Sequence, residues 1–228
     1  MRALRGRAET IEADRAVTRE VVENTRDTGD PAVRVWTPHK QVAFGRRDTR
    51  AEGYETAQAA AEEHDFPTYE RGVGGRAVAY TGNTVAFART EPIEDIREGM
   101  QDRYSSATTD LQVALSRLGV HAHPGEPPDS FCPGSHSLQV RDNGKIVGIA
   151  QRIQRGVALV AGIVVVCDHE SIVSVLEAVY APLDVPFDPD SVGSIECTES
   201  DTDPERVTRE IERSLAGDEY SVERVRQD

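Results

Sequence analysis

The most informative stretch of this 228-residue chain reads GKIVGIAQR, from Gly144 to Arg152. Its apolar, β-branched composition predicts a strand, and the Asp-Asn-Gly tripeptide at 142–144 tolerates the positive φ of a tight turn. Residues 137–141 precede this turn, so we expect the two segments to form an antiparallel hairpin. The apolar run 157–167 that follows has strand length and should extend the same sheet.

Lys145 opens this otherwise apolar strand. Its charge must face either solvent or a polar site, because an unpaired ammonium is costly to bury. A solvated lysine at a strand edge is the more common arrangement. The alternative is a rigidly held ammonium that polarises a carbonyl or holds an acyl-phosphate oxygen.

The remaining segments are a mixture of helical and strand-like patterns. Apolar residues recur at helical spacing near the N-terminus, and Asp203-Pro204 supplies a cap and a first-position proline for a last helix. We expect helices over residues 10–23, 49–64, 93–118, 171–180 and 203–216, and further strands over residues 32–36, 41–45, 77–80 and 83–89. A break around residues 104–107 is the alternative to one continuous helix over 93–118. Because regular strand-helix-strand repeats are missing from the sequence, we predict an α/β (α+β) single domain with a mixed, largely antiparallel sheet flanked by helices.

The charge composition is strongly biased. The net charge is −14 at pH 7, which disfavours a nucleic-acid partner because phosphates would be repelled. The chain has 24 arginines but only two lysines, Lys40 and Lys145. Acid excess with lysine depletion is typical of adaptation to high salt, and a lysine retained in such a chain is a candidate for a specific role.

The three cysteines, Cys132, Cys167 and Cys197, are too few and too widely spaced for a disulfide framework or a zinc site. Cys167 follows an apolar run and is expected to be a small buried residue. No metal-ligand set, run of 18 apolar residues or secretory signal is visible. We therefore expect a soluble, cytoplasmic protein with no membrane partner.

Cys132 lies in the segment SFCPGSHS, residues 130–137. Four prolines between residues 124 and 133 exclude a helix interior or central strand there, so the cysteine should be on an accessible loop. Such a cysteine can act as a nucleophile through its thiolate. His136, His121 and His123 are candidate bases among which the sequence does not choose, and an inert loop cysteine is the equally supported alternative.

A third candidate is the segment RGVGGRAV, residues 71–78, between two expected strands. Paired glycines let backbone approach a ligand closely and expose N–H groups that can hold an anion or a carbonyl. A plain tight turn is the alternative. The segment is neither a P-loop nor a dinucleotide fingerprint, because no Gly-Lys-Ser/Thr follows and a strand comes where a helix should begin.

In this order, the three segments resemble the catalytic domain shared by lipoate–protein ligases, octanoyltransferases and biotin–protein ligases. The family's glycine-rich motif is matched by Arg71, Gly74, Gly75, Ala77, Val78, Gly82 and Asn83. Its strand motif Gly-Lys-Ile-x-Gly-x-Ala-Gln-Arg is matched by residues 144–152, with Lys145 at the family's substrate-binding lysine, and residues 42–47 resemble its early strand ending in Gly-Arg. The resemblance covers about residues 8–180, and it leaves residues 181–228 as a C-terminal extension with a helix within one domain, 1–228.

The loop Cys132-Pro133-Gly134-Ser135 resembles that of cysteine-dependent octanoyl and lipoyl amidotransferases. The resemblance implies transfer of an octanoyl or lipoyl group from a carrier such as the glycine-cleavage H protein to a lysine of a lipoyl domain, such as that of a 2-oxoacid dehydrogenase E2 component. Cys132 would form a thioester and Lys145 would hold the acyl carbonyl, with no cofactor required. The implied substrate-binding residues are Arg71, Gly74, Gly75, Arg76, Ala77, Gly148 and Gln151.

Two alternatives remain open. One is an ATP-dependent lipoate–protein ligase that acts through lipoyl-adenylate and uses ATP and magnesium. Against it, Arg76 stands where ligases usually have a third glycine, and Tyr80-Thr81 stands where they commonly have His-Asp. The other is an inactive module that only binds lipoyl domains.

The charge composition predicts that stability depends on salt. A net charge of −14 repels itself when it is unscreened, and the Debye length falls from about 30 Å at roughly 0.01 M salt to about 3 Å at roughly 1 M. The melting temperature should therefore rise between low and molar KCl, as measured by thermal unfolding. A flat melting temperature over that range would remove the argument for adaptation to high salt.

Overall fold

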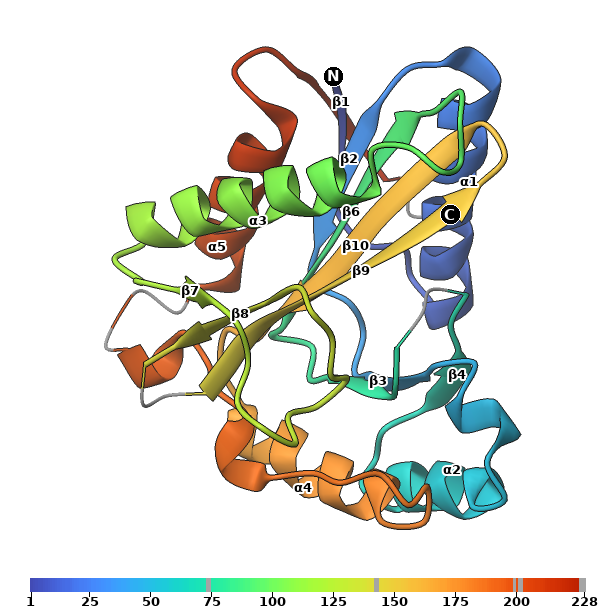
Figure 1. Cartoon of the computed structure of the whole chain (residues 1–228), viewed down its shortest axis with the longest axis vertical. Helices are drawn as coiled ribbons and strands as arrows, with labels where there is room; N and C mark the ends of the chain where they lie inside the picture. The colour runs from blue at the N-terminus through green and yellow to red at the C-terminus, as the bar shows by residue number, and fades with distance from the viewer. Residues whose placement is uncertain (73–74, 142–143, 199, 201–202, 226–228) are drawn as a thin grey trace.

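Three antiparallel strands, β6, β10 and β9, lie side by side at the centre of the larger of two sheets (Figure 1). The structure is a computed structural model that describes residues 1–72, 75–141, 144–198, 200 and 203–225. Within these ranges the larger sheet has eight strands in the order β11-β1-β2-β6-β10-β9-β8-β7. Its strands are β1 (Arg2–Arg5), β2 (Ala32–Trp36), β6 (Val85–Pro92), β7 (His123–Pro124), β8 (Ser137–Val140), β9 (Gly144–Gln154), β10 (Val157–Val164) and β11 (Ser221–Arg224).

Strand direction confirms the predicted mixed, largely antiparallel sheet. β1 runs parallel to both of its neighbours, β2 and β11, whereas the other paired strands of this sheet are antiparallel. The expected hairpin is also confirmed, because β8 pairs with β9, with a register shift between Leu138 and Gln139. Residues 142 and 143 of its turn lie outside the described residues.

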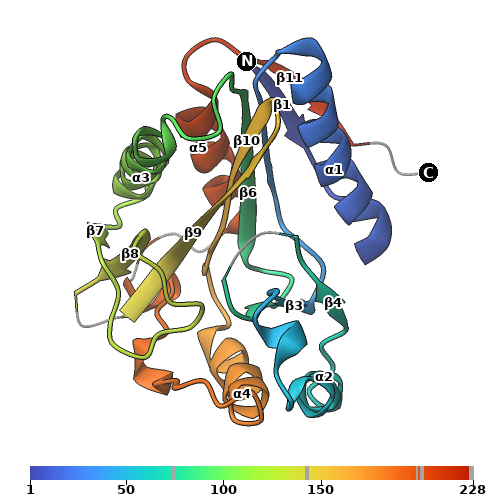
Figure 2. The same ribbon diagram turned by 45° about the vertical axis from the view of Figure 1, so that its right-hand side comes forward.

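Helices cover both faces of the larger sheet. α3 (Met100–Arg117) and α5 (Pro204–Ala216) pack together on one face, and α1 (Ile11–Thr28) lies on the other (Figure 2). The main apolar core lies between the α3–α5 layer and the sheet, and includes Val33, Phe87, Leu111, Leu115, Ile146 and Ile211. No helix in the described part of the chain is long and apolar enough to cross a membrane.

A second, smaller sheet lies toward the bottom of the view in Figure 1. β3 (Gln41–Phe44) pairs parallel with β4 (Thr68–Glu70) and antiparallel with β5 (Val78–Tyr80). Helices α2 (Tyr54–Glu63) and α4 (His169–Tyr180) pack against each other and against this sheet (Figure 1). The two sheets together hold the glycine-rich segment close to the loop that carries Cys132.

Local capping signals set several helix ends. Thr10 caps α1 by accepting a hydrogen bond from the Ala13 N–H, and the helix continues to Thr28, beyond the predicted residue 23, before Gly29 at φ 78° ends it. The last helix begins as predicted, with Asp203 as its cap and Pro204 at its first position.

Other predicted elements are shorter in the structure or divided. Residues 93–99 are not helical, and α3 begins only after Gly99, which has a φ of 68°, and is unbroken to Arg117. The predicted helix over residues 49–64 is divided into a 3-10 turn, Asp48–Arg50, and α2, and Gly53 at the start of α2 lies against the Pro182 backbone. β10 ends at Val164 instead of continuing to residue 167.

The sequence analysis missed two strands at one end of this sheet, β11 at its edge and β1 beside it. Both are short, and β11 is fully exposed, so neither shows the alternation that marks a half-buried strand. Arg5 on β1 is paired with the fully buried Glu212 of α5, and its Nε lies 3.1 Å from Glu212 Oε2. The segment after residue 180 therefore packs on the same sheet as the rest of the chain.

A buried ion pair fixes α1 over its face of the sheet. Arg34 on β2 is fully buried and pairs with Asp14, and its Nη1 donates to Thr18 Oγ1 at 2.7 Å. The Trp36 indole N–H donates to the other Asp14 oxygen at 2.8 Å. Burial lowers the pKa of Arg34, against the opposing effect of the Asp14 charge. Since breaking such a pair costs about 3–5 kcal/mol, α1 is held firmly.

Candidate active site

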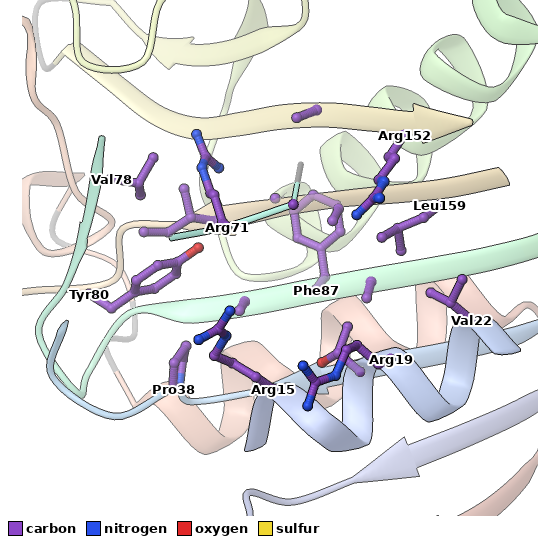
Figure 3. Close-up of a pocket in the computed structure, with 18 of the residues that line it drawn as sticks. Arg15, Arg19, Val22, Pro38, Arg71, Val78, Tyr80, Phe87, Arg152 and Leu159 are labelled. Atoms are coloured by element: carbon purple, nitrogen blue, oxygen red, sulfur yellow. The ribbon is translucent and has the colours of Figure 1, made fainter. Parts of the chain in front are cut away.

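A cavity of about 590 Å³ lies between α1 and the central strands of the larger sheet (Figure 3). Most of its sheet wall is apolar and consists of small residues and a few larger ones: Ala86, Phe87, Ala88, Ile149, Ala150, Leu159, Ala161, Gly162 and Ile163. Arg152 and Gln154 of β9 are polar residues on the same wall. Such a volume and lining suit a small ligand with an aliphatic portion. Small residues keep the space open, and Gly162 is required because a Cβ there would lie 2.4 Å from the Phe87 ring.

Cys132 lines this cavity from the loop between β7 and β8. It is half-buried and has a φ of 42°, a left-handed conformation that non-glycine residues rarely adopt and that surrounding contacts must maintain. One such contact is the Tyr180 hydroxyl, which accepts from the Cys132 N–H at 2.8 Å and donates to the Ala77 carbonyl at 2.7 Å. Tyr180 thereby connects the cysteine loop to the glycine-rich segment through α4.

Arg71 places a positive charge beside the sulfur. Its Nη2 lies 3.1 Å from Cys132 Sγ and donates to the Arg76 carbonyl at 2.6 Å. Burial acts to lower the pKa of Arg71, but its interactions with Cys132 and Tyr80 outweigh burial and raise the pKa. A cation next to a cysteine is the setting in which thiolates are reactive.

Gly75 makes room for this contact. It has a φ of 101°, and a Cβ there would lie 2.4 Å from Cys132 Sγ and 2.7 Å from Arg71 Nη2. Any side chain at this position would push the sulfur and the guanidinium apart. The glycine thus has both a conformational and a steric reason to be present.

Lys145 lies beneath the same loop and is fully buried. Its ammonium donates to Glu126 Oε2 at 2.7 Å, to the Phe131 carbonyl at 2.9 Å and to the Cys132 carbonyl at 3.1 Å. These three bonds use all the N–H groups of the ammonium. Lys145 is therefore not a solvated lysine at a strand edge, which is the more common of the two arrangements that its sequence position allows.

Glu126 completes the arrangement. Besides Lys145, it accepts from the Ser137 hydroxyl at 2.7 Å and from the Gly134 N–H at 2.8 Å. Burial acts to raise the pKa of Glu126, but the hydrogen bonds from Lys145 and Ser137 and the lysine charge outweigh burial and lower it. An ionised carboxylate thus ties both ends of the cysteine loop to the Lys145 ammonium.

The Lipoyl protein ligase A/B catalytic domain model matches residues 10–216. The chain belongs to this family. The match extends past residue 180, where the sequence motifs ended, and includes α5.

Curated relatives agree with this assignment. An octanoyl-[GcvH]:protein N-octanoyltransferase of Anoxybacillus flavithermus is 35% identical over 128 residues, which is 55% of this chain and 45% of the relative. The protein of the same description from Kyrpidia tusciae is 30% identical over 152 residues, 66% of this chain and 50% of the relative. The chain thus matches about half the length of these relatives.

A solved structure supports the fold. The crystal structure of a lipoate-protein ligase A bound with ATP superposes with a TM-score of 0.76 at 17% identity, covering 99% of this chain and 89% of that one. This likeness confirms the predicted ligase-like α/β architecture.

Within this family fold, several predicted site residues meet at the cavity. Cys132, Arg71 and Gly148 line it, and Gly75 lies where a Cβ would collide with the sulfur. Lys145 reaches the Cys132 backbone from below without lining the cavity. Gly74 lies outside the described residues.

Three other predicted residues are not brought to the cavity. The Arg76 guanidinium pairs with the fully buried Asp48, with 3.1 Å between Nη1 and Oδ1, so it is not directed at a ligand phosphate. Ala77 is buried, and its carbonyl accepts from the Tyr180 hydroxyl.

Gln151 lies on the α3 side of β9, where its side-chain oxygen accepts from Arg103 Nε at 2.8 Å. Side chains alternate between the two faces of a strand, so its neighbour points the other way. Its neighbour Arg152 lines the cavity instead.

The candidate bases and the other cysteines lie elsewhere. His136 stacks on Tyr104 with ring centroids 3.7 Å apart, and burial lowers its pKa. His121 and His123 are exposed.

Cys167 is half-buried, whereas we expected it to be buried. Its partial burial, together with the negative charges of Asp168 and Glu196, raises its pKa to about 11.

Sequence reasoning missed Glu126 and Tyr180. Neither lies in a motif that the family resemblance singled out. Glu126 stands between two prolines in a loop, a place where a carboxylate that must be held in position could have been suspected. Tyr180 is close to Cys132 only because α4 packs under the loop.

The structure predicts different reactivity for two of the thiols. At pH 7.5 a thiol with a pKa of about 11 is roughly 0.03% thiolate, so Cys167 should be alkylated slowly. Cys132, with Arg71 beside its sulfur at a cavity wall, should react faster with iodoacetamide. Peptide mass spectrometry over time measures both rates in one sample. Faster labelling of Cys167 than of Cys132 would contradict this description of the site.

The burial of Lys145 predicts a stability effect. Lys145→Arg must place a larger, planar group where three hydrogen bonds fit an ammonium, so we expect a loss of about 3 kcal/mol, as for a broken buried ion pair. Lys40→Arg is the matched control, since Lys40 is half-buried, donates to the His64 carbonyl and lies over the Phe66 ring, contacts that arginine can also make. Denaturant unfolding measures both. Equal stability of the two variants would show that Lys145 does not hold the loop.

Proposed function

We propose that this chain transfers an octanoyl or lipoyl group to a lysine of a lipoyl-domain protein through a thioester on Cys132. The observation that carries the proposal is the Cys132 sulfur at the wall of an apolar cavity with Arg71 at 3.1 Å. Membership of the lipoyl protein ligase A/B family and relatives described as octanoyltransferases support the same chemistry.

The proposed reaction has two acyl-transfer steps. In the first, Sγ attacks the acyl carbonyl of an acyl-lysine on the donor protein, the amide C–N bond breaks, and the proton of the thiol ends on the released lysine amine. In the second, the amine of the acceptor lysine attacks the thioester and the thiol is restored. One amide replaces another, so the sequence needs no ATP or other cofactor, and a covalent nucleophile divides it into two easier steps.

Each neighbouring residue has a role in this proposal. Arg71 stabilises the sulfur as a thiolate, Gly75 lets it lie against the glycine-rich segment, and Gly148 lines the acyl cavity. Lys145 holds Cys132 in place through its carbonyl. It would have to give up one of its three hydrogen bonds to hold the acyl carbonyl as well.

The proposed partners are small acyl carriers and acceptors. The donor would be a protein such as the glycine-cleavage H protein, and the acceptor a lipoyl domain such as that of a 2-oxoacid dehydrogenase E2 component. We further propose a salt-rich cytoplasm as the location, which the net charge of −14 and the 24 arginines against two lysines support.

An ATP-dependent lipoate–protein ligase is the second candidate. The arginines that line the cavity favour it, since they could meet a phosphate. Arg76 does not add to them, because its charge is committed to Asp48.

The decisive experiment is intact-mass analysis after incubation with octanoylated glycine-cleavage H protein. The native chain should gain one octanoyl group that hydroxylamine removes, and Cys132→Ser should lose transfer to an apo lipoyl domain by roughly 10⁴-fold or more while remaining folded. Cys167→Ser and Cys197→Ser, the matched controls, should keep transfer activity. Full activity of Cys132→Ser, or acylation that requires free octanoate and ATP, would favour the ligase instead.

A further inference from the structure

A stripe of arginines on α1 borders the cavity on the side away from the central strands. α1 contributes Arg15, Arg19 and Arg26, whose spacing of four and seven residues puts them on one helix face. Arg46, Arg71 and Arg152 line the same cavity from other segments. Figure 3 shows that Arg15, Arg19, Arg71 and Arg152 lie around one space.

This stripe is a local reversal of charge. Among the described lining residues, six are arginines and three are acidic, in a chain whose net charge is −14. One of the three acids, Asp14, is buried and already paired with Arg34. The cavity surroundings are therefore positive on an otherwise negative protein.

Several of these arginines have no anionic partner. In the described part of the chain, the exposed Arg19 and Arg46 form no ion pair within 4.0 Å, and neither does the half-buried Arg152. Arg15 donates to the Glu70 carbonyl at 2.9 Å and lies over the Tyr69 ring, which leaves its charge uncompensated. Grouping like charges in this way is unfavourable unless a partner of opposite charge neutralises them.

We infer that this arginine stripe is the docking surface for an acidic acyl-carrier domain that presents carboxylates beside its acylated lysine. The inference rests on the proposed function and names the surface its carrier uses. Guanidinium groups pair with carboxylates in a bidentate, oriented manner. Because the stripe and Cys132 line the same cavity, a carrier seated on it can direct its acyl-lysine toward the sulfur. The negative charge of the rest of the chain repels an acidic carrier from other faces.

Charge reversal tests this inference directly. Arg19→Glu and Arg209→Glu change the net charge equally, but Arg209 lies on α5, on the opposite side of the sheet, and forms a surface ion pair with Glu205. The dissociation constant of octanoylated glycine-cleavage H protein is measured by fluorescence anisotropy, at one fixed KCl concentration, in a Cys132→Ser background that prevents turnover. We expect binding at least tenfold weaker with Arg19→Glu and unchanged with Arg209→Glu. Equal effects of the two substitutions would overturn the inference.

A second measurement separates docking from chemistry. In chains that keep Cys132, Arg19→Glu should slow loading from the octanoylated carrier at least tenfold more than loading from a small octanoyl thioester. Failure of the native chain to load from either donor would overturn the proposed function, and the binding comparison would still decide the docking surface. The docking assignment would be overturned if Arg19→Glu weakened the binding of ATP or of a short DNA duplex but left carrier binding unaffected.

Discussion

The geometry of the candidate site depends on one buried charge, the Lys145 ammonium. It is fully buried beneath the cysteine loop and is compensated by the Glu126 carboxylate and two backbone carbonyls. A buried ammonium without such partners would be prohibitively costly, so the loop can adopt only conformations that supply them. The constraint acts in both directions, because the lysine fixes the loop and the loop makes the burial of the lysine tolerable.

Cys132 is held in a left-handed conformation between two such anchors. Lys145 binds its carbonyl, and the Tyr180 hydroxyl binds its N–H. Since Tyr180 also bonds Ala77, the loop, α4 and the glycine-rich segment share one hydrogen-bonded network. The sulfur is thereby kept against Arg71 and Gly75, which is the preorganisation that a nucleophile at a fixed point requires.

Charge is distributed on two scales in this molecule. Over the whole chain, the excess of carboxylates gives a long-range negative field that salt screens. Around the cavity, α1 turns several arginines toward one space, and the buried Asp14–Arg34 pair fixes the helix that carries them. The same acidic protein can therefore carry a positive surface where its proposed partner would approach.

The sequence by itself determined the elements whose signals are local. The hairpin of β8 and β9 follows from strand composition and a turn tripeptide, and the last helix from an Asp-Pro start. Ordered motifs identified the family, and Cys132 was a candidate because prolines and glycine keep its segment irregular. These properties depend on neighbouring residues along the chain.

Only the tertiary structure decided which residues meet. Whether Lys145 faces solvent or the loop depends on Glu126, 19 residues away, and on the side of β9 that is covered. Gln151 and Arg152 are adjacent in the motif, yet α3 packs on one face of β9 and the cavity lies on the other, so the two side chains have different environments. β1 and β11 pair although they come from opposite ends of the chain, and Arg5 of β1 also pairs with Glu212 of α5. Such contacts depend on loop closure and desolvation over the whole chain, which local sequence patterns do not encode.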